Sequence, residues 1–153
     1  MNNTVYVGSD HAGFAFKKAL LKELQFRFPS IAFQDLGCED EQSCDYPDFS
    51  EKVANQVVAQ QARGIMICGS GIGVAIAANK IPGIRAATVW DSVSATLSKE
   101  HNNTNVICFG ARLIKLEVAV GACEAWLKTE FAGGRHQKRI DQITALEKKY
   151  GTS

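Results

Sequence analysis

The sequence predicts an α/β fold with one parallel, doubly wound sheet of five strands and helices on both faces. Short apolar runs rich in β-branched residues alternate with longer stretches of helical periodicity between residues 4 and 131. An additional amphipathic pattern follows the last strand. Because such alternation favours parallel strands joined by right-handed crossovers, we expect a Rossmann-like sheet with an extra C-terminal helix.

Each expected element has its own local signal. The strands are expected at residues 4–8, 30–37, 64–68, 84–90 and 105–110, and the helices at 13–28, 48–62, 74–80, 92–101 and 116–131. Asp91 is placed to cap the helix that follows it. A last helix over 136–150 carries Ile140, Ile143 and Leu146 on one stripe. Since no strand follows it, this stripe could pack on its own sheet or on a second subunit.

Length and composition limit the class of protein. The 153 residues suit a single domain, 1–153, and the 46% hydrophobic and 22% charged fractions are ordinary for a globular chain. A net charge of +1 argues against nucleic-acid and lipid partners, and no apolar run is long enough to span a bilayer. The first residues do not resemble a signal peptide, so we expect a cytoplasmic protein.

The five cysteines are expected to be free thiols in such a compartment. Cys38 and Cys44 could pair or bind a metal, but their spacing matches no zinc pattern. Cys108 and Cys123 fall inside a strand and a helix and are expected in the core. No metal site is therefore predicted.

Candidate site residues are those that follow strands, because ligands of such sheets bind beyond the carboxyl ends. By this rule the candidates are Ser9, Asp10, His11, Cys68 with its glycine turn, Asp91, Gly110 and Arg112. His101 and Asn102 precede the fifth strand and are expected at the opposite edge. They need a bend in the chain or a neighbouring subunit to join the others.

The turn from Gly69 to Gly73 opens a helix, and its free amides would face one point. This arrangement suits a phosphate, a carboxylate or a negatively charged intermediate, although a tight turn without a ligand is the alternative. Cys68 directly precedes the turn, where a helix start favours the thiolate, so it is a candidate base or nucleophile. Burial as a small apolar side chain is the other interpretation.

Motifs for cofactors are absent. A dinucleotide site would need a third glycine at position 74, where the chain has Val74, and no phosphate-binding GxxxxGK[ST] pattern occurs. A thiol phosphatase would need arginine at that same position. We therefore expect no cofactor.

Basic side chains near the C-terminus suggest an anionic ligand. Arg135 and Arg139 lie four residues apart at the start of the last helix, where cations oppose the dipole. Arginine binds phosphate in bidentate fashion, although a solvated basic helix end is an equal alternative. His11, His101 and His136 fall in polar loops or at helix ends, and histidine suits proton transfer at neutral pH.

Five stretches make the chain resemble the type B ribose-5-phosphate isomerases, which are grouped with galactose-6-phosphate isomerase subunits. They are GSDHAGF, DYPDF, CGSGIGVAIAANKIPGIRAA, HNNTNVICFGAR and GGRHQKRI, and they extend from residue 8 to residue 140. The resemblance implies cofactor-free and metal-free interconversion of an aldose phosphate and its ketose through an enediolate, as in the pentose phosphate pathway. It also implies homodimers, or dimers of dimers, whose sites are shared between subunits.

The same resemblance implies a role for each site residue. Cys68 would be the base that moves a proton between C2 and C1, and His101 would open the sugar ring with Asp10 near the ring oxygen or hydroxyls. The substrate-binding residues would be His11, Tyr46, Gly69, Ser70, Gly71, Ile72, Gly73, Asn102, Arg112, Arg135 and Arg139. A six-carbon substrate such as allose or galactose 6-phosphate, and a non-catalytic module that binds a phosphate ligand, are the alternatives.

Overall fold

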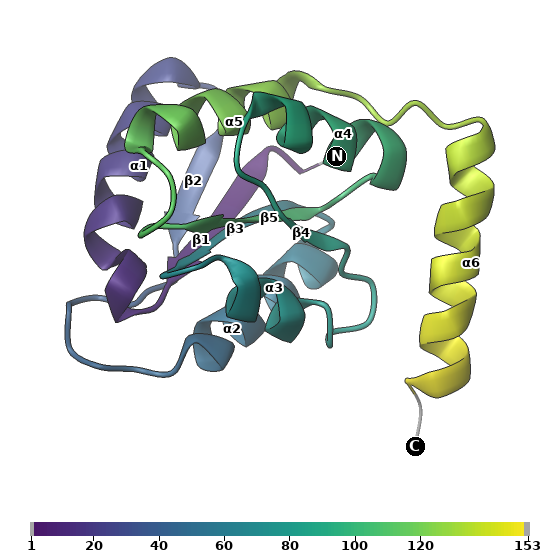
Figure 1. The fold of residues 1–153 in the computed structure, drawn as a ribbon, viewed down its shortest axis with the longest axis horizontal. Helices are drawn as coiled ribbons and strands as arrows, with labels where there is room; N and C mark the ends of the chain where they lie inside the picture. Colours follow the sequence, from purple (N-terminus) through teal and green to yellow (C-terminus); the bar gives the residue numbers. More distant parts are fainter. Residues whose placement is uncertain (1, 152–153) are drawn as a thin grey trace.

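The computed structural model describes residues 2–151 and confirms the predicted fold class (Figure 1). Five parallel strands form one sheet in the order β2-β1-β3-β5-β4. They are β1 (Thr4–Ser9), β2 (Ala32–Asp35), β3 (Arg63–Cys68), β4 (Ala86–Thr88) and β5 (Val106–Gly110). The strands β1, β3 and β5 are central and almost wholly buried, as their continuous apolar runs require.

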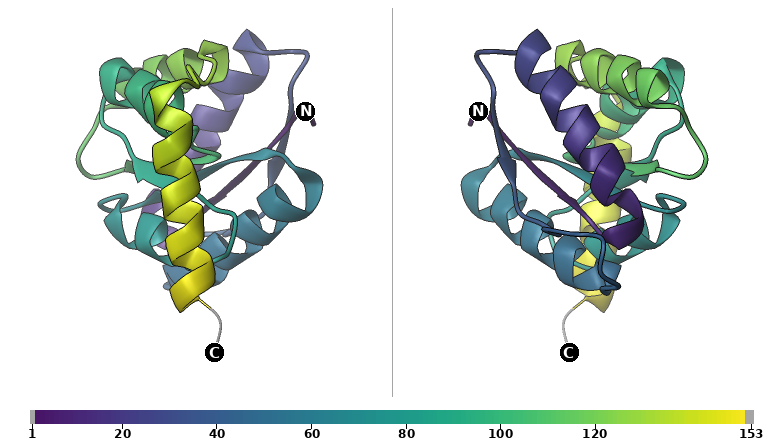
Figure 2. Two further views of the ribbon diagram at one scale, coloured as in Figure 1. Left: turned by 90° about the vertical axis from the view of Figure 1, so that its right-hand side faces the viewer. Right: turned by 90° about the vertical axis from the view of Figure 1, so that its left-hand side faces the viewer.

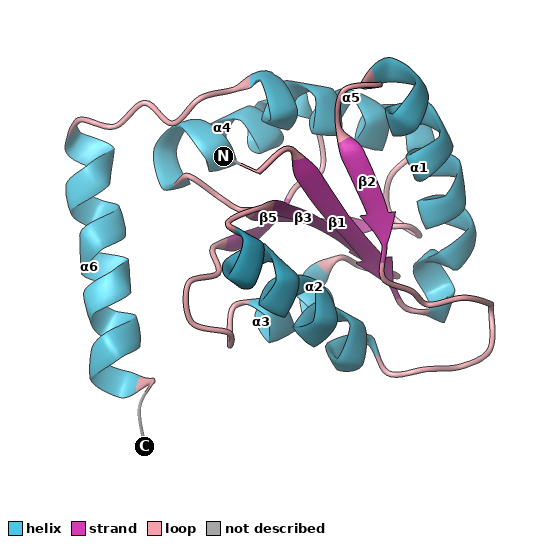
Figure 3. Cartoon of the chain, turned by 180° about the vertical axis from the view of Figure 1, so that it is seen from behind, coloured by secondary structure: helices cyan, strands magenta, loops and turns pink. Residues whose placement is uncertain are grey.

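Helices cover both faces of the sheet (Figure 3). One layer contains α1 (Phe14–Arg27), α4 (Ser92–Asn102) and α5 (Leu116–Lys128), and the other contains α2 (Tyr46–Gln60) and α3 (Ile72–Ala78). Successive side chains of a strand alternate between faces. In β3, accordingly, Ile65 and Ile67 pack on the first layer, whereas Met66 and Cys68 pack on the second.

The chain leaves β1 and β3 toward opposite faces. After β1 it enters α1 in the first layer, and after β3 it enters α3 in the second. Neighbouring strands whose connections diverge in this way open a crevice at their carboxyl ends. Ser9 and Cys68 end these two strands, so the crevice starts between them.

The last helix, α6 (Arg135–Tyr150), stands apart from both layers (Figures 1 and 2). It passes the β4 edge of the sheet and ends near the loop after α3, where the Glu147 carboxylate accepts bonds of 3.1 and 3.2 Å from the Gly83 amide. Ile140 is buried, but Ile143 and Leu146 on the same stripe are 46% and 57% exposed. Part of the apolar stripe is therefore uncovered by this chain.

Local boundaries differ slightly from the predictions. β4 is limited to Ala86–Thr88, and a short 3-10 helix, His11–Gly13, precedes α1. The predicted cap at Asp91 is confirmed, because its carboxylate accepts from the Ser94 amide at 2.7 Å and the Ser94 hydroxyl accepts from the Asp91 amide. No helix within residues 2–151 combines the length and apolar character needed to cross a bilayer.

Candidate active site

Cys68 is the last residue of β3, and its side chain is only 4% exposed. The backbone N–H of Gly71 donates a hydrogen bond to Sγ at 3.2 Å. An amide donor at the start of a helix stabilises negative charge at this place. The sulfur therefore lies where a base that cycles between thiolate and thiol could work.

The loop that holds Cys68 requires glycine. Gly71 has a φ of +74°, and a Cβ on it would lie 2.7 Å from the carbonyl carbon of Phe109. A Cβ on Gly110 would in turn lie 2.6 Å from the carbonyl oxygen of Ser70. Thr88 donates a 2.6 Å hydrogen bond from its hydroxyl to the Gly71 carbonyl. The loop is thus held against the ends of β4 and β5 by backbone contacts that a side chain would break.

Two predicted substrate-binding side chains flank the same loop. The ring of Tyr46, at the start of α2, lies so close to Gly73 that a Cβ there would be 2.6 Å from its Cζ. The guanidinium of Arg112 lies over Gly69, where a Cβ would be 3.0 Å from Nη1. The loop amides therefore sit between an aromatic ring and a cation, a combination that suits a sugar with an anionic group.

Asp10 and His11 continue β1 at the same edge. The Asp10 amide donates to the carbonyl of Ile67 at 3.2 Å, and its carboxylate caps the 3-10 helix by accepting from the Gly13 amide at 3.0 Å. Nδ1 of His11 accepts a hydrogen bond of 3.2 Å from the Cys44 amide. This contact assigns the neutral ring its hydrogen on Nε2, which leaves that nitrogen as a donor.

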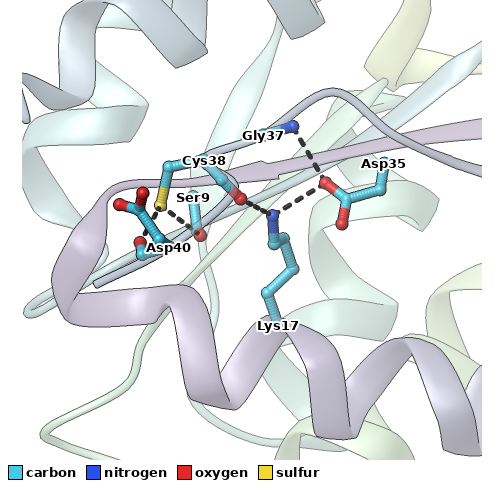
Figure 4. A network of polar contacts seen from close by, with 6 residues as sticks. All are labelled: Ser9, Lys17, Asp35, Gly37, Cys38 and Asp40. Carbon is cyan, nitrogen blue, oxygen red and sulfur yellow. Dashed lines mark hydrogen bonds and ion pairs between the residues drawn. The ribbon is translucent and has the colours of Figure 1, made fainter. Parts of the chain in front are cut away.

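A buried lysine, Lys17, fixes the segment that pairs with Ser9 at the end of β1 (Figure 4). The fully buried ammonium of Lys17 donates to Asp35 Oδ1 at 2.7 Å and to the Cys38 carbonyl at 2.6 Å. Next to it, the Ser9 amide donates a hydrogen bond to the Gly37 carbonyl, and the Cys38 amide donates one to the Ser9 carbonyl. The end of β1 is therefore held between β3 and a segment that Lys17 anchors.

The remaining predicted residues lie elsewhere. His101 and Asn102 are in the last turn of α4, which begins at the carboxyl edge and ends at the amino edge of the sheet. The ring of His101 stacks on that of His136 in α6, with centroids 4.3 Å apart. Arg135 and Arg139 are exposed in the same first turns of α6.

These positions divide the predicted site into two groups. The carboxyl edge brings together Asp10, His11, Tyr46, Cys68, the loop Gly69, Ser70, Gly71, Ile72 and Gly73, and Arg112. The other group is His101, Asn102, Arg135 and Arg139. Within one chain the two groups do not meet.

His136 is distinctive electrostatically. Partial burial, followed by the positive charges of His101, Arg135 and Arg139, lowers its pKa. The ring of His136 thus lies beside the cationic side chains of the second group, which disfavour its protonation, and the carboxylate of Glu100 opposes this effect.

The sequence prediction gave no site role to three contributors to this geometry, Lys17, Cys44 and Thr88, and it named His136 only as one of three histidines suited to proton transfer. Lys17 had a signal, because it shares the core-facing spacing of Phe14, Leu21 and Leu24 and so places a charge on an apolar stripe. Thr88 and Cys44 act through contacts with residues distant in sequence, which no local pattern carries. All five cysteines are free, and within residues 2–151 no three His, Cys, Asp or Glu side chains converge as a metal site.

Comparison with known proteins agrees with this architecture. The family model described as Ribose/Galactose Isomerase matches residues 5–143. The chain is 45% identical over 150 residues to a putative sugar phosphate isomerase of Bacillus subtilis, covering 95% of this chain and 97% of that one. It is 42% identical to ribose-5-phosphate isomerase B of Escherichia coli, covering 93% and 95%.

Solved structures give the same result. A ribose-5-phosphate isomerase B from Clostridium thermocellum superposes with a TM-score of 0.92 at 44% identity, covering 96% of this chain and 99% of that one. The Mycoplasma genitalium enzyme with bound ribulose-5-phosphate gives 0.90 at 38% identity, covering 95% and 97%. The chain therefore belongs to the ribose/galactose isomerase family of sugar phosphate isomerases.

Proposed function

We propose that this protein interconverts ribose 5-phosphate and ribulose 5-phosphate, with Cys68 as the base. The observation that carries the proposal is the Cys68 sulfur, which accepts the Gly71 amide in a loop flanked by Tyr46 and Arg112. Relatives named ribose-5-phosphate isomerase B support the pentose as substrate. No step of the proposed reaction needs a metal or an organic cofactor.

The chemistry follows from the loop. The Cys68 thiolate removes the proton from C2 of the open-chain aldose, and the C–H electron pair forms the C1–C2 double bond of an enediolate. The hydroxyl proton on O2 passes to O1, and the Cys68 thiol then returns its proton to C1. The amide of Gly71 is engaged by sulfur and that of Ile72 by the Ser70 hydroxyl. The amides of Gly69, Ser70 and Gly73 are therefore assigned to the charged oxygen, where one such donor is typically worth about 10²–10³ in rate.

A second copy of the chain completes the proposed site. His101 would open the furanose ring, and Asp10 of the first copy would lie near the ring oxygen. His11 and Arg112 would contact the phosphate from one chain, and Arg135 and Arg139 from the other. The separation of these groups within one chain and the exposed stripe of α6 both support a shared site.

The first experiment measures isomerisation of ribose 5-phosphate by the wild type, Cys68→Ala and Cys108→Ala. Cys108 is a matched control, because it is a thiol on the adjacent strand whose pKa is raised by burial. Loss of about 10²–10⁴ in kcat for Cys68→Ala alone is expected of a general base. Activity that survives in Cys68→Ala would refute the assignment of the base. Turnover of hexose 6-phosphates without turnover of ribose 5-phosphate would refute the pentose substrate.

A mixing experiment tests the shared site. Cys68→Ala and His101→Asn are each inactive in the proposal, but a mixed dimer holds one site with both intact residues. Equal mixing after reversible dissociation should restore about a quarter of wild-type activity. Mixtures that stay inactive, although mixed dimers are detected by mass, would refute the exchange of His101 between chains.

A further inference from the structure

Three cations meet at the amino edge of the sheet, the edge opposite Cys68. Arg63 begins β3, Arg85 directly precedes β4, and Lys99 lies in the last turn of α4. All three line one cavity of about 280 Å³ between the ends of α2 and α4. None of them belongs to the site proposed for isomerisation.

Lys99 is buried and Arg63 and Arg85 are half-buried, and within residues 2–151 none of the three forms an ion pair with a carboxylate. Lys99 is only 8% exposed, and Nε of Arg63 is fully buried and makes no hydrogen bond with any described residue. Among residues 2–151, no carboxylate oxygen lies within 4.0 Å of any of the three. A charge removed from water in this way is normally paired, since desolvation without a partner is costly.

The electrostatic environment agrees with the geometry. Burial lowers the pKa of Arg63, Arg85 and Lys99, and the charges of Arg63 and Arg85 lower that of Lys99 further. The nearby carboxylate of Glu147 in α6 raises the pKa of Arg85, in opposition to burial. The cavity therefore has an excess of positive charge.

Helix ends explain only part of this arrangement. α2 and α4 both terminate here, and cations are favourable beside the last carbonyls of a helix. Arg85 is compensated in this way through two of its nitrogens, since Nε and Nη2 donate to the carbonyls of Asn102 and Asn103 at 2.9–3.1 Å. Lys99 and Nε of Arg63 make no such bond with the described residues. Neither Lys99 nor Nε of Arg63 is therefore compensated by an acceptor among the described residues.

We propose that Arg63, Arg85 and Lys99 form a second anion-binding site, which takes a phosphate group. A guanidinium and an ammonium together provide directed donors and a point charge for phosphate oxygens. The cavity volume lies just below the range for drug-sized ligands, about 300–1,000 Å³. It therefore suits inorganic phosphate, pyrophosphate or a small phosphate ester rather than a nucleotide.

The test is a calorimetric titration with pyrophosphate at constant ionic strength. Wild type is compared with Lys99→Met and Arg63→Met, with Lys22→Met as an exposed-lysine control and Arg112→Met to weaken the isomerase site. We expect two anions per chain for the wild type and Lys22→Met, and one for Arg112→Met. Lys99→Met and Arg63→Met should each weaken the second site by about tenfold or more. A parallel titration with glycerol 3-phosphate distinguishes an esterified phosphate from the free anion.

Thermal unfolding without added anion separates binding from structure. Lys99→Met should be as stable as the wild type or more stable, because the lost cation was desolvated and repelled by its neighbours. Unchanged pyrophosphate binding in both Lys99→Met and Arg63→Met would overturn the proposal. A wild type with one site that only Arg112→Met removes would also overturn it. One site that only Lys99→Met and Arg63→Met weaken would support it while contradicting the phosphate role of Arg112.

Discussion

Replacing Lys17 with methionine should destabilise the protein and disturb the chain around Asp10 and His11. Methionine keeps most of the length and the apolar character of the lysine stem but removes the ammonium that joins Asp35 to the Cys38 carbonyl (Figure 4). Asp35 Oδ1 would keep only the Gly37 amide, at 2.9 Å. The Cys38 carbonyl would lose the ammonium as a hydrogen-bond donor. The amide of the same residue donates to the Ser9 carbonyl, so this loss occurs where the segment pairs with the end of β1.

The magnitude follows from burial. A hydrogen bond to a charged group contributes about 1.5–3 kcal/mol. Lys17 is fully buried, but the Asp35 side chain is 35% exposed, so water can replace part of its lost bond. We therefore expect a loss of about 3 kcal/mol in the free energy of unfolding. At about 2–4 °C per kcal/mol for a chain of this size, Tm should fall by about 6–12 °C.

Urea and thermal unfolding of four proteins measure this effect: wild type, Lys17→Met, Asp35→Asn and the double variant. The sum of the losses in unfolding free energy of the two single variants should exceed the loss of the double variant by about 1–3 kcal/mol, because each single variant removes the same Lys17–Asp35 interaction. Lys18→Met, an exposed neighbour, is the control. In folded Lys17→Met, the KM for ribose 5-phosphate should rise more than kcat falls, because His11 is held less well. A Tm within about 2 °C of the wild type would refute the anchoring role of Lys17.

Two further predictions concern the glycine loop and the cationic cluster. Gly71→Ala should cost about 2–5 kcal/mol by urea unfolding, because its positive φ is combined with a Cβ contact of 2.7 Å to the β5 backbone. Gly133→Ala, with a φ of +67° and open space around it, should cost only about 1–2 kcal/mol, and equal losses would exclude the contact as the cause. His136 should titrate in NMR below the usual histidine value of about 6.5, because burial and then the charges of His101 and Arg139 oppose protonation. The folded pKa lies below the unfolded one, so stability from this ring is present above about pH 6.5 and is lost as pH falls through the folded value. Arg139→Gln should raise the His136 pKa, and an unchanged titration would contradict the electrostatic explanation.

The sequence by itself determined the strands, the helices and the position of Cys68. The signals for these elements are local and span a few residues: alternating or continuous apolar residues for strands, helical periodicity for helices, and glycines for turns. They were sufficient to place Cys68 at the end of a central strand and Asp91 at a helix start. The same local order also placed His101 at the edge away from Cys68, which the structure confirms.

Only the tertiary structure decided which distant residues meet. The strand order, the ring of Tyr46 over Gly73, and the hydroxyl of Thr88 on Gly71 all join segments that are far apart in the chain. The burial of Lys17 and the gathering of three cations around one cavity are of the same kind. Such contacts depend on how whole helices and strands pack, and no local pattern of residues encodes the direction in which a neighbouring element approaches.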